Sequence, residues 1–274
     1  MSLSNLAFAE IIYLRSIDKL KPIFQQIDEN TLVLLDVDDT LITPKSNLFR
    51  YKNNPHRFLI DELKKNQHQY PKFDNILSQW RLQRKIQLVS EEWPSLIEEA
   101  KNAGAFVFAL TQMDTGSLGA ISSMETWRYQ ELRDNNIHFS NSFGNSENKI
   151  LKKDKRGYAV FHKGIIMTGP FSKVEMLELL LQEMNPDKII CVDDREDHIT
   201  NLNAFASQKG IAFTGIVFKA AEDIQGTPHP DIVAIQKKYL VEEAKWLEDD
   251  MAEEILQSLR ERGKGDFSLP CGEG

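Results

Sequence analysis

The stretch Thr31-Leu-Val-Leu-Leu-Asp36-Val-Asp-Asp-Thr40 decides the fold that we expect for this chain. It begins as a short apolar run rich in strand-forming residues, which is typical of a strand buried on both faces of a parallel sheet. The aspartates that follow carry charges that a protein core does not need. We therefore expect a buried strand with a functional loop directly after it.

Similar apolar runs recur along the chain and alternate with segments that have helical periodicity. They predict strands at residues 105–111, 164–168, 188–192 and 211–218, and a hairpin-like segment at 136–163. Helices are expected over residues 90–103, 117–134, 173–184 and 231–262, and a first helix is expected to present Leu6, Phe8, Ile11, Ile12 and Leu14 on one face. Strands that alternate with helices predict the α/β class, with a doubly wound parallel sheet.

Composition limits the classes of function. The chain has 33 Lys and Arg against 41 Asp and Glu, a formal charge of −8. This acidic balance argues against a nucleic-acid binder, which needs clustered basic residues, and no apolar run is long enough to span a membrane. Cys191 and Cys271 are too few for a disulfide framework or a cysteine zinc site, and Cys191 is expected in the core.

The first residues leave the cellular compartment open. Met1-Ser2-Leu3 is interpreted as an expression scar. Ala7-Phe8-Ala9 fits a signal-peptide cleavage site, but no basic region and no long apolar region precede it. We therefore favour a cytoplasmic location, with export as the alternative if an upstream signal has been removed.

Polar residues follow three predicted strands at the point where each strand ends. Asp36 and Asp38 follow the first strand, Thr111 ends the second, and Asp193 and Asp194 follow the strand at 188–192. Because the carboxyl ends of parallel strands meet at one crevice, we expect these side chains to converge there. Clustered carboxylates repel unless a cation compensates them, and hard oxygen ligands favour Mg²⁺ over zinc.

Lys173 adds a positive charge to the same region. It opens the helix that Ser172 and Glu175 are expected to cap. A helix N-terminus with a lysine favours a bound anion such as phosphate. Carboxylates, a metal ion, a hydroxyl group and a lysine around one anion site are the groups that phosphoryl transfer uses.

Four elements of the sequence resemble, in their order and strand context, the four motifs of haloacid-dehalogenase-like (HAD) phosphohydrolases: Asp36-Val-Asp-Asp-Thr40, Thr111, Lys173 and Val192-Asp-Asp194. They look closest to those of a bacterial HAD-like family of unknown function. The resemblance covers residues 31–220. It implies an Mg²⁺-dependent phosphatase with an aspartyl-phosphate on Asp36.

The resemblance also implies a role for each motif residue. Asp38 is the general acid and base, while Thr111 and Lys173 bind the phosphoryl oxygens. The metal ligands implied are the Asp36 carboxylate, the Asp38 backbone carbonyl and Asp194, with Asp193 and Asp197 in support; the motif also permits Asp193 as the direct ligand. Thr40 orients the loop, and Val174 stands where many relatives have glycine.

Simpler interpretations compete for some of these residues. A calcium loop of the EF-hand type needs glycine at its sixth position, and Leu41 stands there instead. Thr111 alone is as readily a turn residue, and Lys173 alone is an ordinary surface lysine. Asp197 and His198 serve equally well as caps of the following helix.

Asp36 and Thr111 lie farther apart than one strand–helix unit requires, which predicts an insertion. We expect a core of residues 1–44 and 91–274, and a helical cap of the C1 type at 45–90. Residues 43–90 hold ten Lys and Arg against three Asp and Glu, either as a solvated helical face or as an attractor for a small anionic phosphoester. A phosphoprotein substrate, a phosphotransferase activity and a catalytically idle binding role remain alternatives.

Overall fold

The computed structural model describes residues 9–52, 54–140, 143 and 146–263. Contacts within the chain divide them into two compact units. Unit 1 takes in residues 9–43, 88–116 and 123–221, and unit 2 takes in residues 44–87, 117–122 and those from 222 onward. The chain passes between the units within two short paired strands, β3 (Ile42–Pro44) and β4 (Ile86–Leu88), and again after residues 116, 122 and 221.

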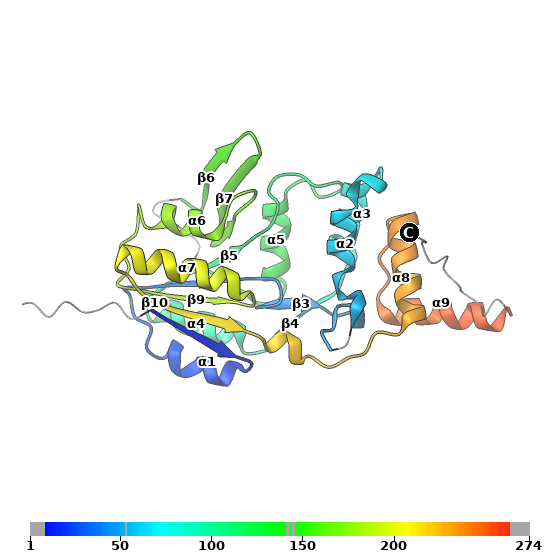
Figure 1. Cartoon of the computed structure of the whole chain (residues 1–274), viewed down its shortest axis with the longest axis horizontal. Helices are drawn as coiled ribbons and strands as arrows, with labels where there is room; N and C mark the ends of the chain where they lie inside the picture. The colour runs from blue at the N-terminus through cyan, green and yellow to red at the C-terminus, as the bar shows by residue number, and fades with distance from the viewer. Residues whose placement is uncertain (1–8, 53, 141–142, 144–145, 264–274) are drawn as a thin grey trace, which may run out of the picture. The chain divides into compact units, whose positions relative to one another are not determined.

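Within the described residues, unit 1 is built on an eight-stranded sheet with the order β1-β10-β9-β2-β5-β8-β7-β6 (Figure 1). The strands are β1 (Ala9–Leu14), β2 (Thr31–Leu35), β5 (Phe106–Thr111), β6 (Asn148–Asp154), β7 (Gly157–His162), β8 (Ile165–Met167), β9 (Lys188–Asp193) and β10 (Ala212–Phe218). The strands from β1 to β8 in this order pair in parallel, and β7 pairs antiparallel with β8 and β6. The predicted α/β class with a mostly parallel central sheet is confirmed.

The strand β2 is fully buried, which explains its apolar composition. The helices of unit 1 are α1 (Ile17–Phe24), α4 (Trp93–Asn102), α5 (Met124–Arg133), α6 (Lys173–Leu180) and α7 (Glu196–Lys209). Leu32 and Leu34 belong to a core cluster that also takes in buried residues of α6 and α7. Elsewhere in unit 1, the Trp93 ring packs edge-on against Phe24 and Phe218. Apolar packing thus holds β2 and the polar loop that follows it in place.

Unit 2 is helical and has an apolar cluster of its own. Its helices are α2 (Leu59–Lys65), α3 (Phe73–Gln83), α8 (Pro230–Glu243) and α9 (Asp249–Glu261), with short 3-10 turns at Asn47–Phe49, Pro55–Phe58 and Gln67–Gln69. The Phe49 ring lies 5.7 Å from the Trp80 ring and 5.8 Å from the Trp246 ring, between centroids. The sequence predicts that the C-terminal helices belong to the core, but Val233 and Leu240 of α8, and Trp246 after it, pack in one apolar cluster with residues of the segment 45–90.

The predicted first helix is wrong in its described part. Residues Ala9–Leu14 form strand β1, which pairs in parallel with β10 at the edge of the sheet. The half-exposed edge position gives no strict alternation of apolar residues, so Ile11, Ile12 and Leu14 also fit a helical face. The predicted contributions of Leu6 and Phe8, and the interpretations of Met1-Ser2-Leu3 and Cys271, lie outside the described residues.

The largest differences from the predicted helix bounds concern two other helices. The long helix expected at 231–262 is divided into α8 and α9, and Ala244 between them has a left-handed φ of 52°. The helix expected from residue 117 begins at Met124, because the Ser123 side chain accepts a hydrogen bond from the Thr126 amide and caps it there.

None of the helices that the structure describes is long and apolar enough to cross a membrane. Cys191 is buried in β9 with a free thiol, which confirms its predicted core position. Burial raises the pKa of this thiol, so it is not an activated nucleophile.

Candidate functional site

Three carboxylates meet at the carboxyl ends of β2 and β9. Asp36 directly follows β2, Asp193 ends β9, and Asp194 comes next. The two strands are parallel neighbours, and the Asp36 amide donates to the Val192 carbonyl over 2.8 Å. One oxygen from each of the three carboxylates lies within 4.8 Å of the others. We call these three residues the acidic cluster.

Lys173 joins two members of the acidic cluster. Its Nζ donates to Asp36 Oδ1 over 2.5 Å and to Asp193 Oδ2 over 2.6 Å. Only 4% of the residue is exposed. Lys173 is the first residue of α6, and the capping box of Ser172 and Glu175 fixes the start of that helix. The sequence prediction of this helix start is confirmed.

The acidic cluster carries more negative charge than Lys173 can balance. Burial raises the pKa of Asp36 to about 7, against the opposing effect of the Lys173 charge. Burial and the charges of Asp36 and Asp193 raise the pKa of Asp194 to about 8. Both carboxyls therefore hold protons more tightly than usual, as expected where anions lack enough nearby cations.

Asp193 has a different environment from its neighbour. Burial opposes its ionisation, but the Lys173 charge and the His198 contact outweigh burial and lower its pKa. His198 Nδ1 lies 3.0 Å from Asp193 Oδ2, and the Arg195 amide donates to Asp193 Oδ1 over 2.9 Å. For Asp194, by contrast, no hydrogen-bond donor is present among the described residues. Asp193 is thus anchored by protein groups, whereas Asp194 is not.

His198 also reaches a residue that the sequence did not single out. Its Nε2 lies 3.2 Å from Oε1 of Gln112, the residue after β5. His198 therefore links the ends of β5 and β9 and does not cap α7, whose N-cap is Arg195. Asp197 pairs with the exposed Arg195 side chain over 2.7 Å and has no contact with the acidic cluster among the residues described.

Asp38 lies apart from the acidic cluster in its side-chain contacts. Its Oδ2 accepts a hydrogen bond from Arg128 Nη2 over 2.7 Å, and half of its side chain is exposed. Arg128 belongs to α5, is almost fully buried and also bonds Glu131 over 2.7 Å. Arg128 was not predicted from the sequence, because no local pattern distinguishes it from the other polar residues of that helix.

Thr111 and Thr40 are buried at the same ends of the strands. Thr111 ends β5, and its carbonyl accepts a hydrogen bond from the Thr168 amide over 3.1 Å. Among the residues described, its side chain forms no hydrogen bond with the acidic cluster. The Thr40 carbonyl accepts from Trp93 Nε1 over 2.9 Å, while the Thr40 hydroxyl is buried and has no hydrogen-bond partner within the part of the chain that the structure describes. Between Asp38 and Thr40, Asp39 has a left-handed φ of 60°.

The acidic cluster fits a divalent metal ion. Three carboxylates and one lysine leave a formal charge of −2, and carboxylate oxygens are the ligands that Mg²⁺ and Ca²⁺ prefer. The Asp38 carboxylate does not belong to this set, because it pairs with Arg128. The resemblance implied the Asp38 backbone carbonyl, and not this carboxylate, as a metal ligand.

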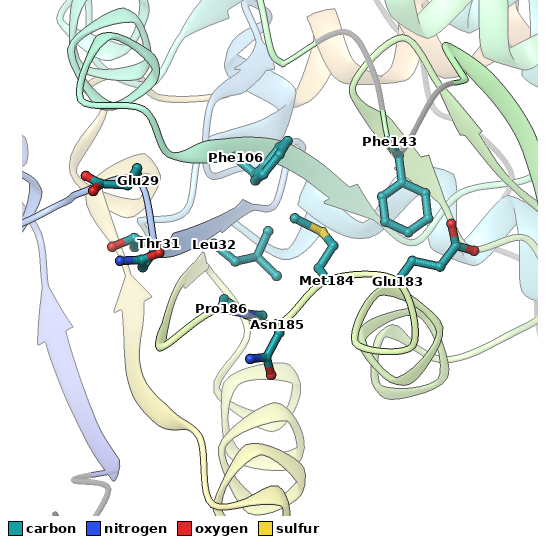
Figure 2. A pocket seen from close by; sticks show the side chains of 10 residues that line it. Glu29, Thr31, Leu32, Phe106, Phe143, Glu183, Met184, Asn185 and Pro186 are labelled. Atoms are coloured by element: carbon teal, nitrogen blue, oxygen red, sulfur yellow. The ribbon is translucent and has the colours of Figure 1, made fainter.

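A cavity of about 310 Å³ lies at the opposite, amino ends of β2 and β5 (Figure 2). Leu32, Phe106, Phe143 and Met184 give it an apolar wall, and Glu29 and Glu183 lie at its edge. Since the acidic cluster is at the carboxyl ends of these strands, this cavity is not part of the candidate site.

The fold and site define an α/β protein with a buried acidic centre at the carboxyl ends of parallel strands. The chain belongs to the family described as "Protein of unknown function (DUF2608)", whose model matches residues 15–253. An uncharacterized protein of Rickettsia prowazekii (strain Madrid E) is 30% identical over 253 residues, covering 91% of this chain and 92% of that protein. An uncharacterized protein of Rickettsia bellii (strain RML369-C) is 24% identical over 229 residues, covering 73% and 74%. No solved structure gives a significant match.

The family match corrects the resemblance seen in the sequence. The assignment to the HAD superfamily is wrong, because the model that matches is that of the family named above and it spans most of the chain. The resemblance rested on four short elements around Asp36, Thr111, Lys173 and Asp194, which are few residues in a chain of 274. Any function for these residues must therefore be argued from their own geometry and chemistry.

Proposed function

We propose that this protein is an Mg²⁺-dependent phosphomonoester hydrolase that forms an aspartyl-phosphate on Asp36. The observation that carries the proposal is the position of Lys173 Nζ, 2.5 Å from Asp36 Oδ1 and 2.6 Å from Asp193 Oδ2. This buried cation lies on the first residue of α6, where the backbone amides of a helix start also favour an anion. A phosphoryl group beside Asp36 would meet both sources of positive charge.

Asp36 is the carboxylate best suited to act as nucleophile. It lies in contact with Lys173, and carboxylates form covalent intermediates in phosphoryl transfer. Cys191 is not a competing nucleophile, since burial raises the pKa of its thiol. Asp36 and Asp194 would hold the metal ion, supported by Asp193 and the Asp38 carbonyl. When bound, the ion would offset charge on the phosphoryl oxygens and orient the ester.

The reaction that we propose has two steps. An Asp36 oxygen attacks phosphorus, the bond from phosphorus to the ester oxygen breaks, and Asp38 gives a proton to that leaving oxygen. Water then attacks the phosphorus of the aspartyl-phosphate, and the Asp38 carboxylate takes a proton from it. The bond between phosphorus and the Asp36 oxygen breaks, which releases phosphate and restores both carboxyls. Lys173 and the Thr111 hydroxyl would hold the phosphoryl oxygens during both steps.

We also propose that the core is doubly wound and that residues 45–90 act as a helical cap for a small anionic phosphoester. The excess of basic residues in this segment supports the proposal, since such a field raises the local concentration of an anion. Arg81 is buried and Arg84 stacks on Trp80, so exposed Lys64 and Lys65 are better positions for a test. Replacing both by glutamine should raise KM and weaken its dependence on salt.

The central experiment measures phosphate release from a panel of phosphomonoesters with Mg²⁺ or with EDTA. We expect turnover that requires Mg²⁺ and is lost in Asp36→Asn, whereas Asp197→Asn, an exposed acid of the same region, retains it. An acid-stable, hydroxylamine-sensitive phosphoryl label on wild type identifies the acyl phosphate. Equal turnover by wild type and Asp36→Asn would refute the mechanism. Phosphate transfer to added alcohols in place of hydrolysis would instead indicate a phosphotransferase.

A further inference from the structure

Arg128 is a buried cation that reaches from α5 to the loop after β2. Its Nη1 donates to Glu131 Oε2 and its Nη2 to Asp38 Oδ2, both over 2.7 Å. Only 3% of its side chain is exposed, and Glu131 is nearly as well buried. Burial opposes the charge on the guanidinium, but the charges of Asp38 and Glu131 outweigh burial and raise its pKa. Arg128 therefore stays positively charged while Asp38 and Glu131 are ionised.

Glu131 accounts for the burial of Arg128 but not for its contact with Asp38. Glu131 lies one helical turn away and supplies the counter-charge that a buried guanidinium requires. Asp38 lies 90 positions away in the chain, and half of its side chain is exposed. An exposed aspartate in a loop normally samples several rotamers. Here the hydrogen bond from the buried Arg128 guanidinium restricts that freedom.

We propose that Arg128 is a positioning residue, which fixes the Asp38 carboxyl in the orientation in which it exchanges a proton with the leaving oxygen and with water. This inference rests on the proposed function, in which Asp38 is the acid and base. Arg128 holds the Asp38 carboxyl through Oδ2. The proton passes from the Asp38 carboxyl to the ester oxygen as its bond to phosphorus breaks, and the Asp38 carboxylate regains a proton from the attacking water.

This role makes a prediction that depends on the leaving group. An alkyl phosphate releases a strongly basic alkoxide, so its cleavage needs a proton from a well-placed acid. p-Nitrophenyl phosphate releases a weakly basic phenolate, so its cleavage depends little on that proton. A misplaced Asp38 should therefore slow the first substrate far more than the second.

The test compares kcat and KM for both substrates in wild type, Arg128→Met and Arg128→Lys. We expect Arg128→Met to lower kcat about 100-fold for the alkyl phosphate and less than about tenfold for p-nitrophenyl phosphate, with little change in KM. Arg128→Lys keeps the charge and should recover part of the alkyl phosphate activity. Arg133→Met is the matched control, because Arg133 is exposed in the last turn of the same helix. It should resemble wild type with both substrates.

A double-mutant cycle separates positioning from a purely structural role. If Arg128 acts through Asp38, Arg128→Met should add little to the loss in Asp38→Asn with the alkyl phosphate. Equal losses on the two substrates, or losses that add in the double variant, would overturn the inference while leaving the hydrolase proposal intact. Absence of turnover by wild type on every substrate would overturn both. If Arg128→Met fails to fold, the losses on the two substrates are compared in Arg128→Lys instead.

Discussion

Replacing Asp194 by asparagine should stabilise the metal-free protein and remove its response to Mg²⁺. Asp194 is the member of the acidic cluster whose pKa is raised to about 8, from a usual value of 3.8. A folded carboxyl of raised pKa retains its proton where the unfolded chain releases it. Asp194 therefore costs the folded state no stability below about pH 4, and it lowers the free energy of unfolding progressively as the pH rises toward 8. Asparagine carries no charge and should avoid this loss.

The size of the effect follows from the same pKa values. Between the unfolded pKa of 3.8 and pH 7, each pH unit costs about 1.36 kcal/mol, so Asp194 contributes up to about 4 kcal/mol of destabilisation at pH 7. Part of this cost is shared with Asp36, which repels Asp194 and is itself raised to about 7. We expect Asp194→Asn to recover about 2 kcal/mol at pH 7 in EDTA.

The assay is urea unfolding at pH 5 and at pH 8, in EDTA and in millimolar Mg²⁺. Wild type should be less stable at pH 8 than at pH 5 in EDTA, and Mg²⁺ should restore stability at pH 8 because it binds the ionised cluster. Asp194→Asn should show a smaller loss with pH and little response to Mg²⁺. Asp197→Asn, an exposed control, should match wild type. A wild type that is as stable at pH 8 as at pH 5 in EDTA, or a variant that Mg²⁺ stabilises equally, would refute the reasoning.

Two further substitutions test contacts that hold the site. Lys173→Met removes the cation from between Asp36 and Asp193 and should cost about 3 kcal/mol of unfolding free energy in EDTA; Mg²⁺ should recover part of this, and a loss below about 0.5 kcal/mol would contradict the pairing. Trp93→Phe removes the indole donor to the Thr40 carbonyl while keeping an aromatic ring, and should cost about 1 kcal/mol by urea unfolding; an unchanged midpoint would show that this bond does not secure the loop.

The sequence predicted the part of the site that depends on topology. A short apolar run followed by acids indicates a buried strand and its end, and parallel pairing brings Asp36 beside Asp193 and Asp194. The capping box likewise gives the start of α6, which places Lys173. These patterns are local or follow from the order of the strands, so a single sequence is enough to recognise them.

Other features depend on contacts that a single sequence does not contain. Strand β1 was interpreted as a helix, because its partner β10 lies about 200 positions away and its own residues fit either pattern. The break between α8 and α9 falls at Ala244, which has a left-handed conformation. Glycine usually occupies such a position at a helix end, so the alanine gave no sign of the break in the sequence. Arg128 was missed for a related reason, since only the folded chain shows that its charge is buried against Asp38.

Two adjacent aspartates at the end of β9, Asp193 and Asp194, have the same side chain but different environments. Asp193 receives Lys173, the Arg195 amide and the His198 ring, and its pKa is lowered. Asp194 has no such donor among the described residues, and its pKa is raised. A carboxylate already held by protein donors gains less from a metal ion than one that lacks them. For the metal ion that we propose, we therefore expect Asp194 and Asp36 to be the direct ligands, and Asp193 to hold Lys173 in place.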